Sequence, residues 1–198
     1  DDFMKLDIIR KRFRDFAEEL DPKNKKTSFV DHHKAHAASA YFASGFNDSL
    51  VLSIDGSGDW ISTALYIGEK NKLIKVDEYF VDQSLGFLYS RAAQILGLGG
   101  FGFGEGKLIA LAAYGRPLKF FPNLINLSEG RYRLDSNYFE IFKQFEKKSS
   151  SFTQEHKDFA ASVQKNLEDA VIYLVNNLHK KYGKTNLAIG GGVGLNCR

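Results

Sequence analysis

Three apolar segments with very short connections, at residues 50–54, 61–67 and 73–81, restrict the fold of this chain more than any other feature. Turn-forming residues 68–71 separate the last two segments. Consecutive strands joined by such short turns pair in an antiparallel meander. Helical patterns precede and follow the meander. The chain is therefore predicted to be an α/β protein.

Apolar residues at helical spacing surround the meander. Helices are expected at about 6–20, 33–42, 84–96, 107–114 and 156–181, and further strands at 28–30 and 186–189. Asp21-Pro22 is expected to end the first helix, because the residue before proline avoids helical geometry. Residues 118–151 show no clear period, and we expect an insertion with one helix near 138–145. His156 and His179, near the ends of the longest helix, are expected at the surface.

The change of pattern at residues 45–48 indicates a boundary between two lobes. Residues 1–47 are expected to form the end of the first lobe, and residues 48–198 most of the second, with a helical insertion at about 84–182. The chain stops on a glycine-rich loop at 190–192 without the helix that normally follows such a loop. We therefore expect a fragment of a larger protein, incomplete at both ends.

Composition excludes several classes of function. The net charge of +3 over 198 residues is too small to indicate a nucleic-acid partner, and the paired lysines read as solvated faces. The single cysteine, Cys197, rules out an internal disulfide and suits a reducing compartment. No apolar run approaches the ~20 residues of a membrane span, and no secretory signal opens the chain. A cytoplasmic protein without a membrane partner is the expectation.

His32 and His36 are candidate metal ligands. A spacing of four residues places both imidazoles on one face of a helix, within reach of one ion. His33 lies about 100° away around that helix and cannot easily share the ion. A His-x-x-x-His pair without further support is more often a pair of surface or packing histidines, and Asp31 fits a helix N-cap equally well.

Two glycine-rich segments each follow a predicted strand. Asp55-Gly56-Ser57-Gly58-Asp59 closes the first strand of the meander, and Gly190-Gly191-Gly192 closes the strand at 186–189. Glycines let backbone amides approach a phosphate, and a carboxylate at a strand end can hold a metal. A simple turn explains either segment taken singly. The segment at 102–107 resembles part of a P-loop but has the wrong spacing and follows no strand, so that interpretation is rejected.

Taken together, these segments resemble the O-carbamoyltransferases of the nodulation and antibiotic-tailoring (nebramycin) type. The matching segments occur in family order from Val30 to Cys197: residues 31–41, 55–59, 84–90, 105–115, 156–164 and 191–197. Gly194 departs mildly from the alanine usual in the family.

The resemblance implies two actin-like, ribonuclease-H-like lobes that bind ATP. It implies a divalent metal, with Fe, Zn and Mn equally suited, held by His32, His36 and Asp55. It also implies a further aspartate ligand beyond residue 198. The residues it assigns to phosphate and nucleotide binding are Gly56, Ser57, Gly58, Gly190, Gly191, Gly192 and Asn196. We expect His32, His36 and Asp55 to converge at the lobe boundary.

The family further implies the reaction and its partners. A separate domain of the same parent chain would form carbamoyl adenylate from carbamoyl phosphate and ATP, and the carbamoyl group would pass to a hydroxyl of a small molecule. Two alternatives remain open. A sugar-kinase-like phosphotransferase would need an aspartate base but not His32 and His36, and a non-catalytic ATP-binding domain would need neither.

Overall fold

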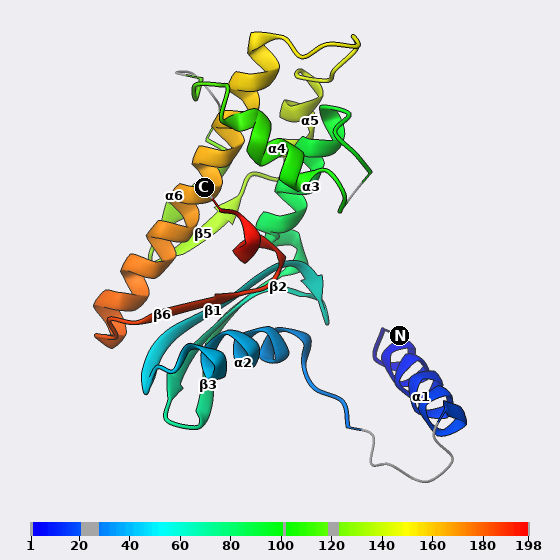
Figure 1. The fold of residues 1–198 in the computed structure, drawn as a ribbon, viewed down its shortest axis with the longest axis vertical. Helices are drawn as coiled ribbons and strands as arrows, with labels where there is room; N and C mark the ends of the chain where they lie inside the picture. Colours follow the sequence, from blue (N-terminus) through cyan, green and yellow to red (C-terminus); the bar gives the residue numbers. More distant parts are fainter. Residues whose placement is uncertain (1, 21–27, 101, 119–122, 198) are drawn as a thin grey trace. The chain divides into compact units, whose positions relative to one another are not determined.

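A four-stranded mixed sheet lies at the centre of the unit His32–Arg198 in the computed structural model (Figure 1). Its strands are β1 (Asp48–Gly58), β2 (Ile61–Glu69), β3 (Lys72–Phe80) and β6 (Leu187–Gly190), in the order β3-β2-β1-β6. β1 pairs antiparallel with β2, β2 antiparallel with β3, and β6 parallel with β1. The predicted meander and the α/β class are confirmed.

The structure describes residues 2–20, 28–100, 102–118 and 123–197, except the side chains of residues 2–7, 9, 10 and 20. It divides into two compact units, Asp1–Asp31 and His32–Arg198. The first unit contains α1 (Asp2–Leu20), which confirms the predicted helix; its predicted stop at Asp21-Pro22 lies outside the described residues. The predicted strand at 28–30 is wrong, because these residues have no regular structure.

Helices cover both faces of the sheet (Figure 1). α2 (His32–Ser44) packs on one face, where Ala37 and Tyr41 join Val51 in a small apolar core. α3 (Leu85–Ile95) and α6 (Gln154–Tyr182) cover the opposite face over a larger core that includes Leu50 and Leu52. Because both faces are buried, β1 reads as a continuous apolar run rather than as alternating residues.

The segment between α3 and α6 contains more structure than its sequence predicts. It holds α4 (Glu105–Ala112), β4 (Ile125–Ser128), β5 (Arg131–Leu134) and α5 (Tyr138–Lys143). The helix near 138–145 is confirmed, but the antiparallel β4–β5 hairpin is an addition. Tyr132 anchors this hairpin, because its ring stacks on Tyr79 at 4.2 Å and its hydroxyl donates to the Gln83 carbonyl at 3.0 Å.

The compact units separate before His32 rather than at 47/48. α2 lies on the sheet formed by β1, β2 and β6, within the same unit. The assignment of residues 1–47 and 48–198 to two ribonuclease-H-like lobes stays a prediction. Among the described helices, none has both the length and the apolar character that crossing a membrane requires.

Candidate metal centre and adjoining cavity

His32 and His36 both point at the Asp55 carboxylate. The Nε2 atom of His32 lies 3.1 Å from Asp55 Oδ2, and the Nε2 atom of His36 lies 3.0 Å from the same oxygen. One ligand atom from each of the three residues lies within 4.8 Å of the other two. The first two turns of α2 and the C-terminal part of β1 therefore bring the three predicted ligands together.

A backbone hydrogen bond orients the Asp55 carboxylate. The Gly56 N–H donates to Asp55 Oδ1 at 2.7 Å, which leaves Oδ2 facing the two histidines. Partial burial by itself raises the pKa of Asp55, but the Gly56 hydrogen bond and the contacts with His32 and His36 outweigh it and hold the pKa below its usual value. The carboxylate is thus kept in the ionised form that ligates metals.

Close approach explains the glycines around this cluster. A Cβ on Gly58 would lie 2.1 Å from the His32 ring, and one on Gly192 would lie 2.8 Å from Asp55 Oδ1. A Cβ on Gly190 would lie 2.7 Å from the His36 carbonyl oxygen. These glycines let two turns pack directly against the candidate ligands, so their first role is steric.

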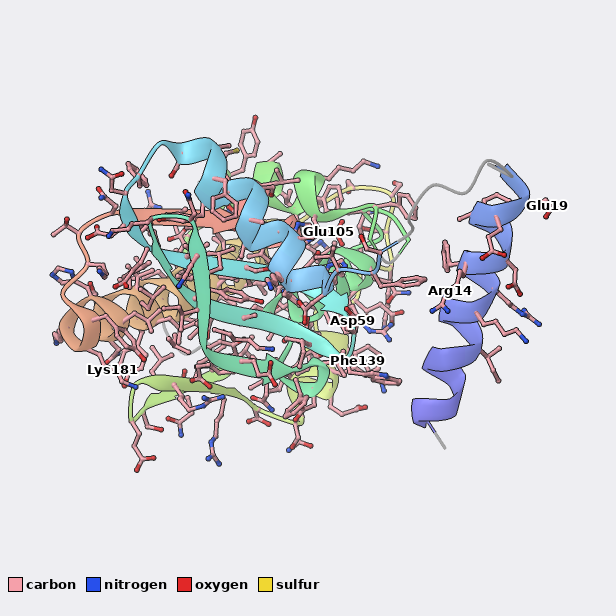
Figure 2. The ribbon with its side chains drawn as sticks, turned by 90° about the horizontal axis from the view of Figure 1, so that it is seen from below. Arg14, Glu19, Asp59, Glu105, Phe139 and Lys181 are labelled. Carbon is pink, nitrogen blue, oxygen red and sulfur yellow. The ribbon has the colours of Figure 1, made fainter. Side chains whose placement is uncertain are left out.

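The β1–β2 turn holds the beginning of α2. Asp59 Oδ2 accepts the His32 backbone N–H at 3.0 Å, and Figure 2 shows Asp59 beside the first turn of that helix. Asp59 and Trp60 have φ angles of 53° and 67°, as a two-residue type I′ hairpin turn requires. The bulky Trp60 is strained in this region. The turn therefore contacts His32 through both Gly58 and Asp59.

His33 faces away from the cluster, as the helical geometry predicts, and has a structural role of its own. Its Nε2 lies 2.8 Å from the Ile61 carbonyl, which only accepts, so Nε2 carries the proton and Nδ1 accepts from Ser53 Oγ at 2.7 Å. The ring is 2% exposed. His33 thus ties α2 to the sheet in a fixed tautomer.

A cavity of about 460 Å³ adjoins the cluster, and Asp55 belongs to both. Of the residues predicted to bind phosphate and nucleotide, Gly56, Gly192 and Asn196 line this cavity. Ser57, Gly58, Gly190 and Gly191 are not among its lining residues. The structure therefore joins one residue of the first glycine segment to one of the second, with Asn196 beside them.

Sequence reasoning missed another part of the cavity wall. Ser90 and Glu105 line it, and the Ser90 hydroxyl donates a hydrogen bond to Glu105 Oε1. Gly102 and Gly106, from the segment rejected as a P-loop, also line the cavity. The glycines at 97–106 were the available signal, but they resembled only part of a P-loop, with the wrong spacing, and did not indicate a carboxylate at a cavity wall.

The donor set fits a divalent transition metal. Two imidazoles and one carboxylate are ligands common to Zn and Fe sites. Metal bonds of ~2.1 Å place neighbouring ligand atoms ~3.0 Å apart at the right angles of an octahedral site and ~3.4 Å apart in a tetrahedral one, so the 3.0 and 3.1 Å separations at Asp55 Oδ2 match octahedral geometry. Two imidazole hydrogen bonds to one carboxylate oxygen would give the same distances, so the arrangement permits a metal without requiring one.

The fold and the site define an α/β protein with a histidine–carboxylate cluster at the wall of a glycine-lined cavity. A family model described as the carbamoyltransferase N-terminus matches residues 5–198. The chain belongs to this family.

Three relatives support the assignment. The chain is 36% identical over 192 residues to nodulation protein NolNO of Sinorhizobium fredii, covering 93% of this chain and 28% of the relative. It is 35% identical over 176 residues to nodulation protein NolO of Bradyrhizobium diazoefficiens, covering 85% and 32%. It is 37% identical over 188 residues to the uncharacterized protein sll1178 of Synechocystis, covering 85% and 30%. The chain thus spans about a third of the length of these curated relatives.

Proposed function

We propose that this chain is the metal- and nucleotide-binding part of an O-carbamoyltransferase. The parent enzyme moves a carbamoyl group from carbamoyl adenylate to a hydroxyl of a small molecule. Another domain of the same parent chain forms the adenylate from carbamoyl phosphate and ATP. One observation carries the proposal: in a chain of the carbamoyltransferase family, His32, His36 and Asp55 converge at a cavity lined by Gly56 and Gly192.

We propose an actin-like, ribonuclease-H-like fold for the parent. In support, the meander of β1, β2 and β3 is extended by β6, a strand parallel to β1. Asp55 lies in the C-terminal part of β1, and the loop at 190–192 follows the C-terminal end of the parallel strand β6. Ligands collect beyond the carboxyl ends of parallel strands in open α/β sheets, so both glycine segments lie at the edge where a nucleotide is expected.

The residues of the site have different roles in the proposed transfer. His32, His36 and Asp55 would hold Fe, Zn or Mn, and the bound ion would supply Lewis-acid stabilisation of the charge that develops on a carbonyl or phosphate oxygen. Backbone amides of the two glycine segments bind the phosphate of the adenylate. The acceptor oxygen forms a bond to the carbamoyl carbon, the bond from that carbon to the phosphate oxygen breaks, and AMP leaves. The proton of the acceptor hydroxyl must pass to a base or to water.

An assay with labelled carbamoyl phosphate tests these residue roles in the full-length parent protein. With ATP, the unsubstituted enzyme is expected to form labelled carbamoyl adenylate and to transfer the label when a hydroxyl acceptor is added. His36→Ala is expected to form the adenylate but not transfer the label, because His36 belongs to the transfer site alone. Labelled acceptor formed at an unchanged rate by His36→Ala would contradict the proposal.

Other outcomes identify the alternatives. Transfer of the ATP γ-phosphate to a sugar hydroxyl, unchanged by His36→Ala, would favour a sugar-kinase-like phosphotransferase. ATP binding without any group transfer would favour a non-catalytic ATP-binding domain.

A further inference from the structure

A buried amide, Gln164, connects three elements behind the cavity. It lies on α6, is 2% exposed, and contacts Tyr89 of α3, Glu168 one turn along α6, and Asn196, which follows the 3-10 turn Gly192–Leu195. Asn196 lines the cavity beside Asp55 and also a smaller cavity of about 230 Å³. Gln164 lines only the smaller one of these two. It therefore stands behind Asn196 as seen from the cavity that adjoins the metal centre.

The hydrogen bonds of Gln164 use its full capacity. Oε1 accepts from the Tyr89 hydroxyl at 2.7 Å and from Asn196 Nδ2 at 3.0 Å. Nε2 donates to Glu168 Oε1 at 2.8 Å and to Asn196 Oδ1 at 3.0 Å. A primary amide offers two donor hydrogens and two acceptor lone pairs, and all four are engaged here.

The partners also determine which way the two amides face. Glu168, as a carboxylate, can only accept, so the Gln164 NH₂ group must face it and Oε1 must face Tyr89. The Asn196 amide must then offer its NH₂ to Oε1 and its oxygen to Nε2. A flipped Asn196 would place NH₂ against NH₂ and oxygen against oxygen, and losing or opposing these partly buried hydrogen bonds costs free energy.

We propose that Gln164 is a positioning residue that fixes the orientation of the Asn196 amide for a nucleotide bound in the cavity. The proposal rests on the proposed function, because the ligand is the same adenine nucleotide. Gln164 acts through Asn196 and does not contact the ligand. Glu168 determines the orientation of the Gln164 amide, because a carboxylate accepts hydrogen bonds and must therefore face the NH₂ group.

Two substitutions separate positioning from folding. Gln164→Leu removes the hydrogen bonds between Gln164 and Asn196 but keeps a side chain of similar volume. Glu168→Gln keeps the size and the position at the partly buried site but introduces a side chain that both donates and accepts, so the Gln164 amide loses its directional partner. Each is expected to weaken ATP binding to the 198-residue chain about threefold to tenfold, the range of one net hydrogen bond. Lys165→Gln, on the exposed side of α6, is the matched control and leaves ATP binding unchanged.

A double-mutant cycle of Gln164 and Asn196 measures whether their effects on ATP affinity are coupled, which a merely structural role of Gln164 would not produce. If Gln164 acts through Asn196, adding Gln164→Leu to Asn196→Ala lowers ATP affinity no further than Asn196→Ala alone. Calorimetric titration with ATP and Mg²⁺ measures all four affinities, and circular dichroism checks folding.

The outcomes distinguish this inference from the function on which it rests. Failure of the unsubstituted chain to bind ATP would overturn the proposed function and this inference with it. ATP binding that Gln164→Leu and Glu168→Gln both leave unchanged would overturn the inference alone. So would additive losses in the cycle, because they would show that Gln164 acts independently of Asn196.

Discussion

At the residue scale, the candidate metal centre depends on a glycine that faces a histidine. Gly58→Ala would place a Cβ 2.1 Å from the His32 ring, so the imidazole must leave the position in which it contacts Asp55. We expect metal affinity to fall about 10–100-fold, as when the supporting contacts of a ligand are lost. Equilibrium dialysis with Zn²⁺ measures the affinity. Gly100→Ala is the matched control, because its Cβ would meet only Phe103, at 3.9 Å.

Metal affinity that falls equally in the two glycine variants would show that the loss is general and not due to displacement of His32. Unchanged affinity in Gly58→Ala would show that the imidazole position has no part in metal binding.

Tyr79 makes the free energy of unfolding depend on pH in the alkaline range. Burial raises its pKa to about 12, although the Arg131 guanidinium 4.2 Å from the ring centroid opposes part of that rise. In the unfolded chain the tyrosine pKa is about 10. Between pH 10 and 12 the unfolded state therefore loses the proton while the folded state keeps it, so the free energy of unfolding falls as pH rises, by on the order of 2 kcal/mol.

Thermal unfolding from pH 8 to 11 checks this expectation. Tyr79→Phe is expected to show a shallower alkaline decline than the unsubstituted chain. A decline still remains in that variant, because burial also raises the pKa of Tyr132. Tyr114→Phe, at a residue 73% exposed, is the control and keeps the full decline. Identical slopes for Tyr79→Phe and the unsubstituted chain would contradict the assignment.

The three metal-ligand candidates and the Ser90–Glu105 part of the cavity wall differ in how far sequence can predict them. The spacing of His32 and His36 and the carboxylate at the end of a strand made these residues candidates, and the resemblance to the carbamoyltransferases implied that they share one metal; the structure brings all three together. Ser90 and Glu105 could not be predicted as a pair. They lie on different helices, and only the packing of α3 near α4 brings them to one cavity.

At the element scale, the end of α4 meets the beginning of α6 at a glycine. A Cβ on Gly115 would lie 1.9 Å from the Lys157 carbonyl oxygen, which belongs to the backbone of α6 and cannot rotate away. We expect Gly115→Ala to lower the free energy of unfolding by about 1–3 kcal/mol, the usual cost of overpacking. Urea denaturation measures this change.

Gly106→Ala serves as the comparison for Gly115→Ala. It lies within α4, and its Cβ would meet no atom within 4 Å. Alanine is favoured over glycine in a helix by about 1 kcal/mol, so this variant is expected to unfold at a slightly higher urea concentration. Equal midpoints for the two variants would contradict the close contact.

The elements that sequence predicts well are those with a long, regular pattern. The meander and α6 have such patterns, and both are confirmed. β4 and β5 have four residues each, too few for a period to emerge. His156 was expected at the surface, but it is 8% exposed and its Nδ1 accepts the Thr153 N–H in a helix cap at 3.0 Å. A capping role of this kind depends on local geometry that a spacing pattern does not contain.

At the scale of the whole molecule, the packing partner of α2 could not be predicted from the sequence. The glycine break at 45–48 led to the prediction that α2 precedes a lobe boundary, and this stays a prediction. Ala37 and Tyr41 of α2 are buried on the same sheet that bears Asp55. The contact of α2 with β1 is what places the two histidines over Asp55, so the candidate site arises from tertiary packing between neighbours in sequence.

The stoichiometry of divalent metal bound to the purified chain, with and without His36, tests the central claim most directly. The unsubstituted chain is expected to bind one ion, and His36→Ala to bind it more than about a hundredfold more weakly, because loss of a supporting contact alone costs 10–100-fold. His179→Ala, which removes an exposed histidine that contacts the Lys184 carbonyl, is expected to retain the ion. Equal metal content in the unsubstituted chain and His36→Ala would contradict the account.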